Sequence, residues 1–181
     1  NQLPLKLSPT EWKLATSRSE MEIHMNTTDN LEQFLPILRT ASIFSGMSDS
    51  EILSVLHCMG AFVSDKEKDS YLLRAGDMTS TMGLLLSGST IVIQEDVWGH
   101  RNIMAQILPG QTFAEPFAAS NGTALNISVV VTKDCSLLYL DIHRILGVCP
   151  SACEHHTHLI QNLISVLAKK LLLFNEKITH M

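Results

Sequence analysis

The stretch from residue 61 to residue 140 limits most strongly what this chain can fold into. Short runs rich in β-branched and aliphatic residues are separated there by turns containing Gly or Asp, at the spacing typical of an all-β sandwich or barrel. The segment EDVWGHRN predicts a hairpin loop with Gly99 at its tightest point. The runs that we interpret as strands are SYLLRAG, MGLLLSGSTIVIQE, RNIMAQILPG, LNISVVVT and CSLLYLD.

Helical patterns lie before and after this β-rich stretch. Residues 31–59 have a helical pattern that is interrupted at Pro36. Ser48 followed by Glu51 forms a capping box, and Gly60 closes the same helix. The segment DIHRIL predicts a short helix that Asp141 caps.

The segment 151–181 predicts a long helix with two apolar faces. Ser151 and Glu154 form a second capping box, so the helix begins near Ala152. Apolar residues at a seven-residue spacing indicate a coiled-coil seam, and we expect a parallel homodimer. The predicted dimer interface consists of Cys153, Ile160, Ile164, Leu167, Leu171, Phe174, Ile178 and Met181. A second apolar line, expected to pack on the β-domain, consists of Leu159, Leu163, Val166 and Leu173. The alternative is a single wide core face.

Composition restricts the class of protein. Among 181 residues, 45% are hydrophobic and 17% are charged, which favours an ordered globular chain. The net charge of −5 opposes a nucleic-acid-binding surface, and no apolar run reaches the roughly 18 residues of a membrane span. Four cysteines are too few for a secreted disulfide scaffold, so we expect a cytoplasmic protein. We interpret residues 1–24 as vector-derived or flexible, 25–150 as a sensor domain, and 151–181 as a dimerisation helix.

The order of these elements resembles the effector domain of the Crp/Fnr transcription regulators. LLRAGD, LLSGS and LPGQTFAEPF (residues 72–77, 85–89 and 108–117) resemble turns of that domain, and the last includes its phosphate-binding cassette. The resemblance implies an α+β, mainly β fold: a β-roll or double-stranded β-helix (jelly-roll-like) with N-terminal helices and a long C-terminal dimerisation helix. Crp/Fnr proteins continue into a helix-turn-helix domain, which we expect to be absent here, so that DNA is contacted only through the missing domain.

The cassette departs from the family pattern in its charge. Phe113 and Glu115 match the family, but Ala114 replaces a glycine, and residues 118–130 contain no lysine or arginine to neutralise a phosphate. Losing that charge-assisted hydrogen bond weakens anion binding roughly 10- to 100-fold, so cyclic AMP is not expected to bind in the family's usual way. The effector is unidentified, and the alternatives are a vestigial site or a Glu115 that only caps a helix. The predicted ligand-binding residues are Phe113, Ala114, Glu115, Pro116, Asn126 and Ser128.

The segment CPSACEHHTH suggests a second site. Thiolates and imidazoles bind zinc, copper, iron or haem, and Cys153 at a helix N-terminus is the more reactive thiol. Paired copies of Cys153 could form a disulfide switch or share a metal, whereas His156 points elsewhere. The alternative is that Cys153 packs in the seam and the histidines are solvated or face a partner. The predicted metal ligands are Cys149, Cys153, His155 and His158, while Cys58 and Cys135 are expected in the core.

These features predict a ligand- or redox-sensing domain that transmits its signal through the C-terminal helix. One alternative is a pure dimerisation module with a vestigial nucleotide pocket. Another is a cupin-like metal enzyme, but the β-rich stretch offers only His100 and His143 for such a centre. No catalytic residues are predicted, and we expect no enzyme activity.

Overall fold

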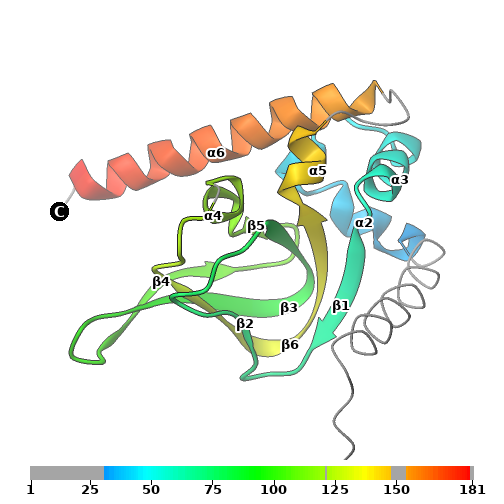
Figure 1. Cartoon of the computed structure of the whole chain (residues 1–181). Helices are drawn as coiled ribbons and strands as arrows, with labels where there is room; N and C mark the ends of the chain where they lie inside the picture. Colours follow the sequence, from blue (N-terminus) through cyan, green and yellow to red (C-terminus); the bar gives the residue numbers. More distant parts are fainter. Residues whose placement is uncertain (1–30, 121, 148–153, 180–181) are drawn as a thin grey trace, which may run out of the picture.

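The computed structural model describes residues 31–120, 122–147 and 154–179, with side chains in the last helix described as far as Glu176. The segment 1–24 and the predicted helix start near Ala152 lie outside these residues. The described part combines one antiparallel sheet with helices before and after it (Figure 1). The predicted mixture of N-terminal helices, β-roll and C-terminal helix is therefore confirmed, while the dimerising role of the last helix stays a prediction.

A curled six-stranded sheet forms the middle of the molecule (Figure 1). Its centre is the antiparallel pair β3 (Thr81–Glu95) and β6 (Ser128–Asp141). The register of this pair shifts between Leu85 and Thr90, and such irregularities bend a sheet. The other strands are β1 (Phe62–Lys66) and β2 (Tyr71–Leu73), which pair with β6, and β4 (Arg101–Ile107) and β5 (Thr112–Phe113), which pair with β3.

The sequence predicted most of this sheet, but not all of it. The predicted hairpin joins β3 to β4, and Gly99 in its loop has a positive φ of 83°. The runs LNISVVVT and CSLLYLD were expected to be two strands, whereas residues 128–132 of the first and all of the second lie in the single strand β6. Strands β1 and β5 were not predicted, because the first is largely polar and the second has only two residues.

The chain before β1 forms short helices. Pro36 lies in the first turn of α2, so it begins a helix rather than interrupting one. The predicted capping box is confirmed: Ser48 Oγ accepts from Glu51 N–H, and the Glu51 carboxylate accepts from Ser48 N–H at 2.7 Å. These helices are η1 (Glu32–Phe34), α2 (Leu35–Leu38), η2 (Ser42–Phe44) and α3 (Asp49–Cys58).

Three further helices follow the strands. α4 (Glu115–Ala119) comes directly after β5, and α5 (Ile142–Leu146) comes directly after β6. Asp141 caps α5 as predicted, accepting from His143 N–H at 2.8 Å. The long helix α6 (His155–Thr179) crosses the whole molecule and passes over α4 (Figure 1). No described helix is both long and apolar enough to span a membrane.

The buried side chains form two clusters. The larger one lies between the N-terminal helices, α5, α6 and one end of the sheet, and the smaller one lies inside the roll. Of the second apolar line predicted on α6, Leu159, Leu163 and Val166 are buried, which confirms three of its four members. Leu173 is 59% exposed, so its assignment was wrong. The reason is geometric: Leu159 and Leu163 join the larger cluster, whereas every residue from 168 to 176 is exposed.

Gly88 and Gly76 offer a test of the close approach between β3 and β6. Both glycines have positive φ, 82° and 94°. A Cβ at Gly88 would lie 2.3 Å from the Asp134 carbonyl oxygen, whereas a Cβ at Gly76 would meet nothing within 4 Å. We expect Gly88→Ala to lower the free energy of unfolding by about 2–4 kcal/mol, and Gly76→Ala by about 1 kcal/mol. Urea unfolding of both variants checks this, and equal losses would contradict it.

Candidate functional site

The cassette is a sharp turn between β5 and α4. A Cβ at Gly83 would lie 2.2 Å from Phe113 Cζ, so only glycine lets the Phe113 ring lie against β3. Ala114 has a φ of 68°, a left-handed conformation that costs a residue with a Cβ about 1–2 kcal/mol. Phe113, Ala114 and Glu115 are all buried. Three of the predicted ligand-binding residues thus form one compact, strained corner.

Glu115 carries the main electrostatic feature of this corner. Its residue is only 1% exposed, and its Oε1 accepts from the Thr112 hydroxyl. The same oxygen accepts from Lys170 Nζ at 2.7 Å, and Lys170 Nζ also donates to the Thr112 carbonyl oxygen at 2.6 Å. Glu115 is the first residue of α4, and Ala114 is its N-cap. The alternative in which Glu115 only caps the helix is therefore wrong.

Lys170 is the residue of this corner that the sequence did not predict. Residues 118–130 contain no cation, but the structure supplies one from α6. The two partners are 55 residues apart, so no local spacing could reveal the pair. An ammonium group beside a buried carboxylate offsets the cost of removing that charge from water. Glu115 is therefore not the uncompensated acid that the sequence suggested.

The remaining predicted ligand residues lie differently. Pro116 and Asn126 are exposed. Ser128 is half-buried, and its hydroxyl accepts from Ala75 N–H at 2.9 Å, which ties it to the LLRAGD turn. Among the described contacts, those of Glu115 are with Thr112 and Lys170. The structure thus groups residues 113–115 and connects Ser128 to a different turn.

The predicted metal cluster is only partly described. Cys149 and Cys153 lie outside the described residues. His155 Nδ1 is 3.1 Å from Glu51 Oε1. The ring of His158 packs near Gly46. No three metal-binding side chains come together among the residues that the structure describes, and the role of the two cysteines stays a prediction.

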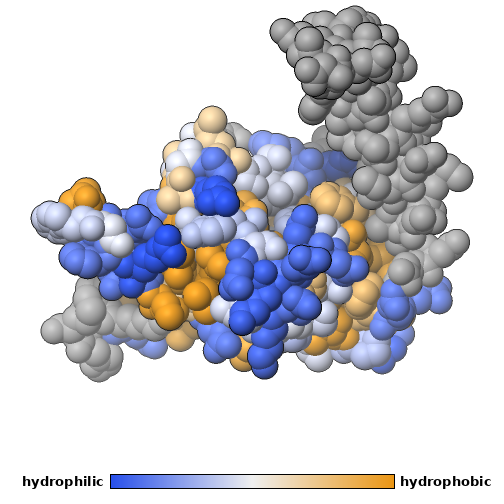
Figure 2. Space-filling model, turned by 90° about the horizontal axis from the view of Figure 1, so that it is seen from below, coloured by the Kyte–Doolittle hydropathy of each residue, from blue (hydrophilic) through white to orange (hydrophobic). Residues whose placement is uncertain are grey.

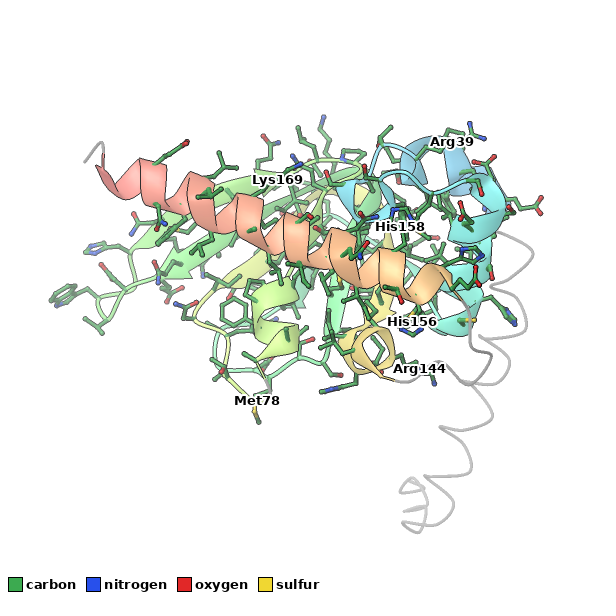
Figure 3. All side chains as sticks on the ribbon, turned by 90° about the horizontal axis from the view of Figure 1, so that it is seen from above. Arg39, Met78, Arg144, His156, His158 and Lys169 are labelled. Atoms are coloured by element: carbon green, nitrogen blue, oxygen red, sulfur yellow. The ribbon has the colours of Figure 1, made fainter. Side chains whose placement is uncertain are left out.

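His156 separates from the other two histidines, as predicted. It is buried, and its Nε2–H donates to the Ile145 carbonyl oxygen at 2.6 Å. Figure 3 shows His156 and His158 on different sides of α6. The alternative that the histidines are solvated or face a partner is wrong for His156, which connects α6 to α5.

The two remaining cysteines lie in the core, as expected. Cys135 is buried in the smaller cluster, and Cys58 packs against the larger one. Burial raises the pKa of the Cys135 thiol, with the nearby Asp65 and Asp134 carboxylates adding to the effect. Cys135 is therefore a packing residue rather than a reactive one.

Comparison with known proteins identifies the domain. Residues 65–151 match the family model of the cyclic nucleotide-binding domain. These residues are identified as a cyclic nucleotide-binding domain. The matched part begins inside β1, so it covers the roll and leaves out most of the helices on either side. No curated protein matches the chain in sequence.

Solved structures of cyclic nucleotide-binding and regulator domains share this fold. The catabolite activator protein of Thermus thermophilus is 19% identical, with a TM-score of 0.66 over 77% of this chain and 62% of that one. The sensor domain of the transcriptional regulator DNR from Pseudomonas aeruginosa is 15% identical, with a TM-score of 0.58 over 81% and 91%. The regulatory subunit of a cAMP-independent protein kinase A from Trypanosoma brucei is 20% identical, with a TM-score of 0.60 over 81% and 48%.

These comparisons confirm the resemblance to Crp/Fnr effector domains at the level of domain family and fold. The chain spans about 62% of the catabolite activator protein and 48% of the kinase subunit.

Substitutions at Glu115 and Lys170 should have unequal effects on stability. Lys170→Met leaves a buried carboxylate without its counter-charge, and we expect a loss of about 1–3 kcal/mol of unfolding free energy. Glu115→Gln removes the buried charge, and the released ammonium group can be hydrated because the Lys170 side chain is 43% exposed. We expect that loss to stay below about 1 kcal/mol. Urea unfolding measures both, and an equal or reversed order would contradict the assignment.

Cys135 provides a test of the smaller cluster. With the other three cysteines replaced by serine, the single thiol should react with an aromatic disulfide reagent at pH 8 at least about 100-fold more slowly than in urea. The reason is that both its burial and its raised pKa suppress the thiolate. The unfolded protein is the internal control. Comparable rates in the folded and unfolded states would show that the roll does not protect this residue.

Proposed function

We propose that this chain is the ligand-sensing and dimerising part of a Crp/Fnr-type transcription regulator acting in the cytoplasm, and that it is not an enzyme. The fold, the cassette and the regulators among its structural neighbours support this proposal. The observation that carries it is the set of apolar side chains that α6 exposes. The helix packs Leu159 and Leu163 into the protein's own core, and away from that contact it presents large apolar side chains to solvent, most of them beyond Leu167. These exposed residues are Ile164, Leu171, Leu172, Leu173 and Phe174, with 56–63% exposure.

The proposed seam is shorter than the sequence predicted. Ile164, Leu171 and Phe174 are exposed as an interface requires. Ile160 and Leu167 are partly buried against the protein's own larger cluster, so they are assigned to that core rather than to a partner. Cys153, Ile178 and Met181 lie outside the described side chains. A second copy of α6 would therefore pack along the half of the helix that extends beyond the core.

The effector is proposed to be a small molecule bound at the cassette corner, with Glu115 accepting from a hydroxyl group. We do not expect cyclic AMP to bind in the family's usual way, because the cassette has no arginine. The Trypanosoma brucei neighbour, described as part of a cAMP-independent kinase, supports the view that this fold alone does not imply cyclic AMP. A redox signal through Cys149 and Cys153 is a second candidate, supported only by their closeness in sequence.

Disrupting the exposed face should dissociate the dimer. We expect the unsubstituted protein to sediment as a dimer and Leu171→Glu/Phe174→Glu to sediment as a folded monomer. Two buried carboxylates in an apolar seam should weaken association at least about 100-fold. Trp98→Glu is the matched control, because Trp98 is 80% exposed but lies in the β3–β4 loop. Sedimentation equilibrium gives the dissociation constants, and a monomeric unsubstituted protein would refute dimerisation through α6.

Ligand sensing is tested separately by thermal shift with cyclic nucleotides, nucleosides and divalent metals. Stabilisation that Glu115→Gln abolishes would support a sensor. A protein that no compound stabilises, but that dimerises through α6, would favour the pure dimerisation module.

A further inference from the structure

The contact between Lys170 and the cassette acid has a consequence for α6. Lys170 connects the exposed half of this helix to the roll: its Nζ lies 2.7 Å from Glu115 Oε1 and 2.6 Å from the Thr112 carbonyl oxygen. The residues around it on the helix, 168 to 176, are all exposed. Figure 1 shows this half of α6 running over α4 and past the end of the helical layer.

The first half of α6 is fastened in a different way. Leu159 and Leu163 are buried in the larger cluster. Asn162 Nδ2 donates to the carbonyl oxygens of Ile43 and Ser45 at 3.0 Å and 2.9 Å, and His156 bonds to α5. This half belongs to the core and is fixed by apolar burial, whereas the second half makes a charged contact with one buried acid.

We propose that Lys170 occupies Glu115 Oε1 as an internal ligand, and that this contact holds the second half of α6 against the roll. This inference rests on the proposed function, since it says how a change of hydrogen-bond partner at Glu115 would be transmitted to α6. Oε1 of Glu115 already accepts two hydrogen bonds, from Thr112 and from Lys170. A ligand hydroxyl that engages this oxygen must compete with Lys170.

Release of Lys170 has a low electrostatic cost on the lysine side. Its side chain is 43% exposed, so the ammonium group can be taken up by water once it leaves Glu115. The released segment carries Leu171 and Phe174, which are part of the proposed seam. Loss of the contact therefore frees the part of α6 that a partner subunit would hold.

Hydrogen–deuterium exchange without any ligand tests this directly. In Lys170→Met we expect amides of residues 168–176 to exchange at least tenfold faster than in the unsubstituted protein, while amides of residues 156–164 keep their rates. Glu115→Gln, which keeps a neutral acceptor at the same place, should give a smaller increase of about threefold in the same segment. Lys169→Met is the matched control, because Lys169 has the same charge one residue away on the exposed surface (Figure 3).

The same comparison in the Leu171→Glu/Phe174→Glu background separates the contact from dimerisation. An increase that persists there supports the internal contact even if the chain does not dimerise. Equal exchange of residues 168–176 in the parent, Lys170→Met and Glu115→Gln proteins overturns the proposal, even if α6 does form a dimer. If Lys170→Met accelerates exchange throughout the chain, Glu115→Gln decides: an increase confined to residues 168–176 supports the proposal, and no increase there overturns it.

Discussion

The antiparallel pairing of β3 with β6 is the constraint on which the rest of the structure depends. Because side chains alternate along a strand, this pair supplies both clusters of buried residues. Leu84 and Leu138 are paired across it and lie in the larger cluster, while the adjacent pair Leu85 and Leu137 lies in the smaller one. The same strands thus connect the helical layer to the interior of the roll. The pairing also positions the cassette, since β5 is bonded to β3 at Gly83 and α4 follows at once.

The cassette corner brings together strain, burial and charge. Ala114 takes a left-handed conformation, and the next residue places a carboxylate where only 1% of the residue is exposed. Such an acid needs a strong donor nearby, and α6 provides it in Lys170. The buried charge of Glu115 in the roll is therefore compensated by Lys170 of the last helix, 55 residues later in the chain.

The helix α6 has two halves with different roles. The half near His155 is part of the protein's own core, through apolar burial and hydrogen bonds to η2 and α5. Residues 168–176 of the other half are exposed, and Lys170 among them contacts the cassette. In contrast, the face of the molecule seen from the opposite side mixes hydrophilic residues with hydrophobic ones (Figure 2). The large apolar side chains exposed on this half of α6 are Leu171, Leu172, Leu173 and Phe174.

Local patterns in the sequence predicted much of the fold. The capping box of Ser48 and Glu51, the cap at Asp141 and the hairpin at Gly99 follow from short-range geometry, and each is present. The cassette was located from its motif, and Phe113 and Glu115 lie in the same corner. Spacing along α6 also identified Leu159 and Leu163 as buried.

Other features depended on contacts between distant segments. Neighbours in space decide three of these features. They are the joining of two predicted runs in β6, the short strand β5, and the partial burial of Ile160 and Leu167. Above all, the sequence by itself determined that an acid stands in the cassette with no cation near it in the chain. Only the tertiary structure decided that Lys170 neutralises it, because the partner of a buried charge is chosen by distance in space and not by separation along the chain.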